Sequence, residues 1–411
     1  MCQSTGEGEG ADEEMILTLA ALVDASLVQV EITTGNTARF SMLELIREYA
    51  LQRLHAAGEE EEEQCRRRHA AYYARLAETV IAHFGPEQGE RDAHFALAQE
   101  LPNARAALQW AEERREAELG LLLTGFTRLW HIRGQMSETE SWMERMLALD
   151  LQARELGVYT APLTLRIEKL YGLARTLVRH GKGERGAEAL AQEALHLARR
   201  IDDQNNISNA FATLGMIAQA SGKIDEAATA YTESYHYARL TGHSGLKSRA
   251  LSHLADLAST RGDVGHSTAL LEEALINAQA SGMTWDIPSI KTMLGHLAHQ
   301  QQNYAAARAR YQEALTLFRA FGSPTYIALC LEGFAATACA EGHYAQATRL
   351  CAAAATLREQ TQTPLPPAER EAFAQTVATA KAALHEPAFG KEWSTGAALT
   401  QDEAIDDACL T

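Results

Sequence analysis

Two histidines are spaced so that they could bind a metal ion. His296 and His299 lie three residues apart, which places both imidazoles on one face of a helix. A protein metal site ordinarily needs at least a third ligand, and the sequence supplies none beside this pair. We therefore interpret the two histidines as polar groove residues, and we predict no metal or other cofactor.

The cysteines are a second group with potential chemistry, because thiols bind metals and form redox pairs. The sequence has no CxxC spacing and no secretory leader pattern. Cys330 and Cys351 could approach each other across two helices, but a free cysteine more often packs as a small buried hydrophobe. We expect reduced thiols and a cytoplasmic location. The cysteines are Cys2, Cys65, Cys330, Cys339, Cys351 and Cys409.

Signatures of the common enzyme classes are missing from the sequence. It contains no HExxH, no zinc-ribbon cysteine spacing, no Gly-x-Ser-x-Gly and no GxxxxGK[ST] phosphate loop. The glycines at Gly181 and Gly183 belong to a predicted turn between helices instead. We therefore predict a protein that binds and relays signals rather than an enzyme.

The charge balance bears on the class of partner. The formal net charge is −17, from 37 basic and 54 acidic residues, and it opposes general attraction to nucleic acid or anionic lipid. No uninterrupted apolar run reaches the roughly 18 residues that a membrane-spanning helix needs. We expect no membrane association and no direct nucleic-acid binding, although DNA contact through the N-terminal segment stays open as a weaker alternative.

A repeat with a 40-residue period positions the polar residues. In each copy a large apolar residue lies eight positions before the turn, and a small residue follows that apolar residue directly. Leu214 and Gly215 are one such pair. A second apolar stripe at helical spacing follows each turn, so each copy predicts a helix-turn-helix hairpin. The turns begin at Gly222, Gly262, Gln302 and Gly342.

An earlier copy fits when its turn is allowed one extra residue, which gives five units at about 161–361. One hairpin cannot bury its own apolar stripe, so neighbours must stack, and the first helix of each unit should line a concave groove. The pattern of Leu214, Gly215, Ala227 and Tyr231 resembles tetratricopeptide (TPR) repeats. We predict an all-α, TPR-like superhelix of helix hairpins.

Ten residues are predicted to face this groove and to bind a protein partner or a small effector. They are mixed in sign, and any one of them could simply be a solvated surface residue, because few contact residues carry binding energy. The predicted groove residues are Asn209, Met216, Gln219, Arg249, Ser252, Asp256, Thr292, His296, His299 and Glu332.

The segment before the repeats has a different pattern. Residues 11–34 read as a helix followed by a short extended run, and Gly35-Asn36 is a typical hairpin turn. A helix then opens at Ser41 or Met42 and continues to Leu54. These elements predict the C-terminal part of a winged helix within 11–58, after a flexible stretch at 1–10.

Several stretches resemble the region after the ATPase domain of large bacterial STAND-type regulators. In that family a nucleotide-binding domain precedes a winged helix, helical hairpins and TPR-like repeats, often with a LuxR-type DNA-binding module at one end. Because the phosphate loop is missing, we expect a C-terminal fragment, a split gene or a descendant without its ATPase, whose ATPase domain acts in cis or in trans. The stretches are Ala20–Val30, Arg39–Leu54, Arg67–Ala77, Asn103–Trp110, Leu129–Gly134 and Phe389–Ala404.

The expected function is that of a non-catalytic, effector- or protein-binding TPR arm of a signal-transducing transcriptional regulator. The alternative is a free-standing TPR adaptor that binds partner peptides or helices in its groove. Only Arg249 is clearly basic among the predicted groove residues, which does not favour capture of carboxylate tails. The remaining segments are expected to be helical hairpins at 59–160 and capping helices with an acidic tail at 362–411.

Overall fold

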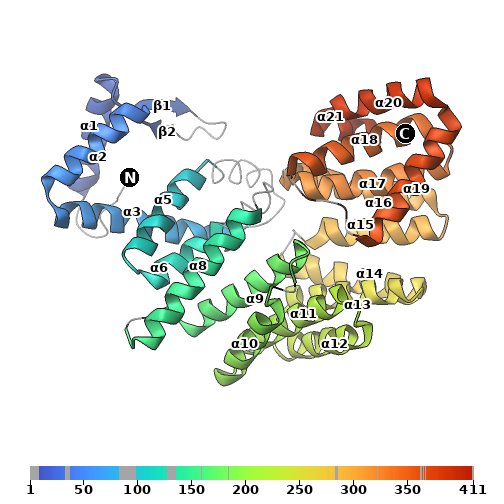
Figure 1. Ribbon diagram of the computed structural model, residues 1–411, viewed down its shortest axis with the longest axis horizontal. Coiled ribbons are helices and arrows are strands. Elements are labelled where there is room, and N and C mark those ends of the chain that lie inside the picture. Colours follow the sequence, from blue (N-terminus) through green and yellow to red (C-terminus); the bar gives the residue numbers. More distant parts are fainter. Residues whose placement is uncertain are drawn as a thin grey trace.

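The computed structural model describes residues 9–409 apart from 33–37, 83–98, 127–135, 283–285 and the single residues 159, 184, 322, 362, 364 and 366. The fold is almost entirely helical, with one two-stranded sheet, as the sequence predicts. Within these described ranges, no helix is both long enough and apolar enough to cross a bilayer. Figure 1 shows the chain descending from the N-terminal helices, passing through α9–α12 and rising again to the C-terminal helices.

The N-terminal unit consists of α1 (Glu9–Asp24), β1 (Gln29–Ile32), β2 (Ala38–Ser41) and α2 (Glu44–Ala57). The strands are antiparallel, and Val30 lies opposite Phe40. This confirms the predicted strand pair, whereas the predicted turn at Gly35-Asn36 lies outside the described residues. The start expected for the second helix was wrong, because Ser41 still pairs with Gln29 and α2 begins at Glu44.

Among the described residues, the helices that link this unit to the repeats are α3 (Glu59–Ala82), α5 (Leu101–Glu113), α6 (Ala117–Leu123) and α8 (Met136–Glu155), with the short 3-10 helix η1 (Thr124–Phe126) after α6. Their common core includes Leu108, Leu121, Phe126 and Met146, which are fully buried. This apolar packing continues without interruption into the first repeat.

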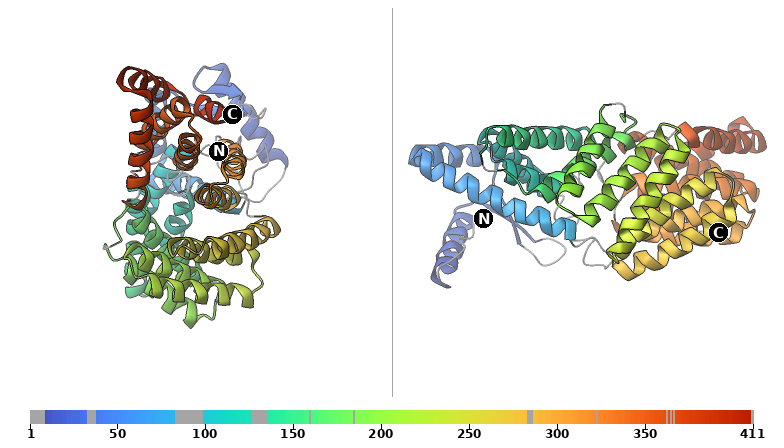
Figure 2. Two further views of the ribbon diagram at one scale, coloured as in Figure 1. Left: turned by 90° about the vertical axis from the view of Figure 1, so that its right-hand side faces the viewer. Right: turned by 90° about the horizontal axis from the view of Figure 1, so that it is seen from below.

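Five hairpins follow, at the period that the sequence predicts. They are α9 (Leu163–Arg179) with α10 (Ala187–Arg200), α11 (Gln204–Ala220) with α12 (Ile224–Leu240), α13 (Ser244–Thr260) with α14 (Val264–Ser281), α15 (Asp286–Gln300) with α16 (Tyr304–Phe321), and α17 (Pro324–Ala340) with α18 (Tyr344–Thr361). First helices of neighbouring hairpins contact one another along the array. Figure 2 shows this stack from two further directions.

Two of the hairpins close where a glycine meets a tyrosine ring. A Cβ added to Gly215 would lie 2.5 Å from the ring of Tyr231, and one added to Gly295 would lie 2.7 Å from the ring of Tyr311. Where the small residue is alanine, at 255 and 335, its partner is the smaller Leu271 or Cys351. The pairs are therefore matched in volume, as close packing requires.

Three C-terminal helices complete the fold: α19 (Pro367–Leu384), α20 (Glu386–Ala398) and α21 (Gln401–Cys409). Helix α20 lies so close to α18 that Gly396 has the backbone of Arg349 where a Cβ would be. The Arg349 guanidinium pairs with Glu392 and Asp407, each at 2.7 Å, and ties α20 and α21 to the last repeat.

Candidate functional site

The first helices of the hairpins surround a concave cavity of about 680 Å³. Its walls also include η1, α8 and α19, so it extends from the linking helices to the C-terminal ones. Among the described lining residues, none belongs to α10, α12, α14, α16 or α18. The volume lies within the roughly 300–1,000 Å³ typical of small-molecule sites.

Two arginines from different repeats meet in this cavity on one amide oxygen. Arg175 in α9 donates from Nη2 to Asn209 Oδ1 (3.1 Å) and from Nε to Thr213 Oγ1 (2.8 Å). Arg249 in α13 donates from Nη1 to the same Asn209 oxygen (3.2 Å). The Arg175 guanidinium also lies 4.8 Å from the ring centroid of Tyr171. Three consecutive repeats are thereby connected through Asn209.

These guanidinium groups create a positive environment. Burial and the nearby Arg249 lower the pKa of Arg175 to about 9. Burial, followed by the charges of Arg175, Arg249 and Arg179, lowers the pKa of His253 to about 3. His253 is therefore neutral at physiological pH, and its ring stacks on Tyr231 with 4.6 Å between centroids.

Acidic groups lie on other parts of the wall. Gln219 Nε2 donates to Asp256 Oδ2 (2.5 Å), while Gln219 Oε1 accepts from the Tyr231 hydroxyl (2.8 Å). In α19, burial, with the charge of Glu332, raises the pKa of Glu369. At the α9 end, Lys169 is only 7% exposed, and burial lowers its pKa. The cavity wall thus carries charged groups of both signs.

Six of the predicted groove residues line the cavity and four do not. Asn209 and Gln219 lie behind it and hold lining residues through the bonds described above. His299 bonds to Thr337 Oγ1 (3.0 Å) away from the cavity. Glu332 turns toward α18, where Arg358 Nη2 pairs with it at 2.7 Å. The lining residues are Met216, Arg249, Ser252, Asp256, Thr292 and His296.

Thr292 and His296 also have internal partners. The hydroxyl of Thr292 is buried and lies 2.9 Å from the Pro288 carbonyl oxygen and 3.0 Å from Cys330 Sγ. His296 Nδ1 lies 3.0 Å from the Tyr311 hydroxyl, and burial lowers the pKa of His296 to about 4. In the described parts of the chain, no group of three His, Cys, Asp or Glu residues could hold a metal ion.

The cysteines of the last repeat are buried. Burial raises the pKa of the Cys330 and Cys351 thiols to about 12, so both are protonated at neutral pH. Cys330 contacts Thr292 of the preceding repeat, which places it in a packed interface between hairpins. The two thiols are therefore structural groups.

Helix α9 supplies cavity residues that the predicted groove set lacks. These include Glu168, Lys169 and Arg175. The first repeat aligns with the second at an offset of 41 residues rather than 40. At this offset Glu168 and Arg175 are the residues equivalent to Asn209 and Met216. The sequence signal was therefore present in the register of the first repeat. The residues from η1, α8 and α19 lie outside the repeats and have no such signal.

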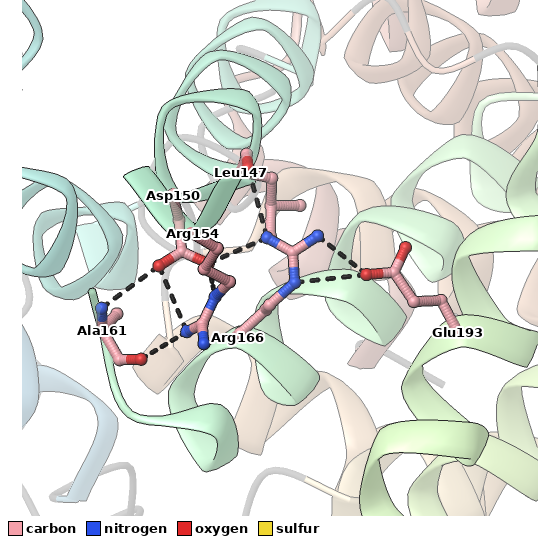
Figure 3. Close-up of polar contacts among 6 residues, drawn as sticks. All are labelled: Leu147, Asp150, Arg154, Ala161, Arg166 and Glu193. Carbon is pink, nitrogen blue, oxygen red and sulfur yellow. Dashed lines mark hydrogen bonds and ion pairs between the residues drawn. The ribbon is translucent and has the colours of Figure 1, made fainter. Parts of the chain in front are cut away.

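The cavity wall is attached to the linking helices by a buried ion-pair network (Figure 3). Asp150 in α8 is fully buried and accepts from Arg166 Nη1 (2.8 Å), Arg154 Nε (2.7 Å) and the Ala161 amide (3.1 Å). Arg166 also donates from Nη2 to Glu193 in α10 (2.7 Å). This network joins α8, α9 and α10 at the start of the array.

A second surface stands out on the N-terminal unit. Large apolar residues there remain between 37% and 80% exposed, and α2 has no buried residue. Exposed apolar groups in such number mark a contact surface in soluble proteins. We call these residues the N-terminal apolar set: Ile16, Leu17, Leu27, Val30, Ile32, Phe40, Met42, Leu43, Leu45, Tyr49 and Leu51.

Comparison with known proteins relates part of the chain to transcriptional regulators. It is 31% identical over 215 residues to mycobacterial proteins named "Putative HTH-type transcriptional regulator", from Mycobacterium bovis and Mycobacterium tuberculosis. The match covers 52% of this chain but 23% of each relative, so the chain spans about a quarter of their length. No family model matches the chain.

Solved structures with similar folds have low sequence identity. A STAND protein with a tetratricopeptide repeat sensor from Pyrococcus horikoshii is 14% identical with a TM-score of 0.44, covering 94% of this chain and 59% of that one. RapI in its apo form is 12% identical with a TM-score of 0.46, covering 70% and 99%. BtubC from P. vanneervenii is 20% identical with a TM-score of 0.43, covering 56% and 94%. At these scores no statement about ligand or activity follows.

Proposed function

We propose that this chain is the ligand-reading arm of a signal-transducing transcriptional regulator of the STAND or LuxR type. The concave cavity is the observation that carries this proposal. It is lined by first helices of all five repeats, and it brings apolar side chains together with charged groups of both signs, so it can contact both the apolar and the polar parts of a small effector. The partial sequence match to transcriptional regulators gives the biological context.

The N-terminal apolar set provides the second surface that such an arm needs. A sensor must pass its state to an effector domain, and exposed apolar residues on a small unit of helices and strands suit docking against another domain. We assign this unit as the end of a winged helix that contacts an ATPase domain in cis or in trans. The buried network around Asp150 then connects the cavity side of the molecule to the linking helices.

The chain itself is proposed to be non-catalytic and cytoplasmic. Asp256 in the cavity is bonded to Gln219, and Arg175 and Arg249 are cations that converge on Asn209, so none of these groups is an activated nucleophile. The net charge of −17 disfavours direct nucleic-acid binding by these residues.

The test replaces the chromosomal gene of the source organism with variants that affect either ligand binding in the cavity or signal relay through the N-terminal unit. Ser252→Trp and Ser289→Trp fill the cavity, since both residues line it. Thr232→Trp places the same bulk on an exposed position of α12 as the control. We expect both cavity variants to change the same transcripts as deletion of the gene does, and the control to behave as wild type.

Leu45→Glu provides the complementary variant, because Leu45 is 80% exposed and its replacement should leave the fold and the cavity intact. We expect it to lose regulatory output while ligand binding is kept. If deletion of the gene changes no transcript, the regulator role is wrong. A chain that controls no transcript but binds a partner helix or peptide in the cavity would be the free-standing adaptor instead.

A further inference from the structure

The contact around Asn209 brings two positive charges together at a side chain that carries no charge. Asn209 Oδ1 is a neutral acceptor, yet Arg175 and Arg249 both donate to it. Among the described residues, Arg175 has no ion pair, and the carboxylate nearest Arg249 is that of Asp286, at 3.9 Å. A guanidinium normally prefers a carboxylate or phosphate in bidentate geometry, so these two groups are incompletely paired.

The surroundings confirm that the charges are concentrated here. Arg179 lies one turn beyond Arg175 on α9 and also lines the cavity. Burial lowers the pKa of Arg175 most, and the charges of Arg249 and Arg179 lower it further, while the charge of Asp286 raises it. The three guanidinium groups therefore repel one another, and Asp286 offsets part of that repulsion. An anion placed among them would relieve this repulsion, whereas a neutral ligand would not.

The remaining wall indicates the rest of the ligand. Apolar side chains from α8, α11, α15 and α17 line the cavity, namely Met143, Met216, Ile290, Met293 and Leu329. Methionine side chains adapt to irregular apolar shapes. Glu168, Asp256, Asp286 and Glu369 also line the cavity and offset the charges of Lys169 and the three arginines, so a monoanion fits better than a doubly charged phosphate.

We propose that Arg175, Arg179 and Arg249 bind the carboxylate of a small ligand whose apolar body occupies the methionine-lined part of the cavity. This inference rests on the proposed role of the cavity as an effector site. The carboxylate would accept from the arginine N–H groups that do not bond Asn209 or Thr213, and the amide of Asn209 would hold both arginines in place.

Matched probe pairs test this on the full chain by isothermal titration calorimetry. One pair is octanoate and octanamide, and the other is a mixed pentapeptide library with free C-termini and the same library with amidated C-termini. Inorganic phosphate is a fifth probe. We expect at least one carboxylate probe to bind at least tenfold more tightly than its amide, with an affinity that falls as salt rises. The two pairs distinguish a small acid from a peptide end.

Two variants connect the binding to the cluster. Arg249→Met removes the positive charge, and Arg249→Lys keeps the charge but lacks the planar guanidinium with its paired N–H donors. Both variants should lower the affinity for the carboxylate probe at least tenfold. Arg261→Met is the matched control, because Arg261 is an exposed arginine at the other end of α13 that pairs with Asp225. Melting curves check that each variant is folded.

Each result has a defined meaning. Equal affinity for the carboxylate and amide probes would overturn the carboxylate site. The cavity would still be an effector site in that case, particularly if Ser252→Trp abolishes the binding of both probes. Binding of phosphate alone, binding unaffected by Arg249→Met, or no binding of any carboxylate probe would each overturn the inference. The transcript experiment is independent of all these outcomes, so failure of the regulator role would be seen separately.

Discussion

Replacing Asp150 with asparagine should weaken the junction between the linking helices and the repeats. The carboxylate accepts two hydrogen bonds from Arg154, one from Arg166 and one from the Ala161 amide, and it has no exposed surface. Asparagine keeps the shape but loses the charge, and its amide nitrogen would face guanidinium donors. The buried Arg166, which is 4% exposed, would then keep only Glu193 as a charged partner.

The size of the effect follows from this geometry. Removing one member of a buried ion pair costs about 3–5 kcal/mol, because the remaining charge stays buried. Arg166 keeps Glu193, and Arg154 is 23% exposed and can be hydrated, so part of that cost is avoided. We expect a loss of about 2–4 kcal/mol in the free energy of unfolding of this region, discounted from the buried-pair range.

The assay must resolve local stability, because stacked repeats unfold in parts rather than in one step. Native-state hydrogen exchange of the α8 and α9 amides, followed by mass spectrometry, measures that free energy directly. Glu144→Gln is the control, since its pair with Arg185 at 3.2 Å is 42% and 48% exposed and is worth less than about 1 kcal/mol. If Asp150→Asn costs no more than Glu144→Gln, the network does not stabilise the junction.

Three further predictions concern packing, pH and thiol reactivity. Gly215→Ala should destabilise by about 1–3 kcal/mol through overlap with the Tyr231 ring, and Tyr231→Leu should restore part of the melting temperature in the double variant. His296 has a folded pKa of about 4 against an ordinary 6.5, so its contribution to stability is lost as pH falls from about 6.5 to about 4. Because His253, with a pKa of about 3, acts over the same range, His296→Gln should reduce the fall in melting temperature without removing it. Cys330 should resist iodoacetamide at pH 8 until the protein unfolds, while the exposed Cys409 is alkylated more readily, as peptide mapping would show.

The fold was predictable from the sequence because its determinants are local and repeated. Pairs such as Gly215 with Tyr231 recur at a fixed spacing, and each pair specifies a hairpin without reference to distant residues. The start of α2 was missed because the strand pairing of Ser41 with Gln29 extends β2 by a residue that helical periodicity alone assigns to the helix.

The cavity was predictable only in part. Residues such as Arg249 and Asp256 follow from the register of the regular repeats. The convergence of Arg175 with Arg249 on Asn209 depends on how three repeats stack, which no single repeat encodes. The Asp150 network similarly joins α8, α9 and α10. It includes the backbone amide of Ala161, and a hydrogen bond from a backbone amide cannot be inferred from the type of residue.

The cavity is lined by the first helices of the hairpins and by none of their described second helices, and this has a mechanical consequence. A ligand there contacts the inner row of the repeat array, together with η1, α8 and α19. Drawing the inner row together shortens one side of the stack only, so the array must bend rather than compress. The signal would then be a change in curvature, and the α1–α2 end would swing relative to α20. Small-angle scattering with and without ligand would measure it as a change in the maximum dimension of the molecule.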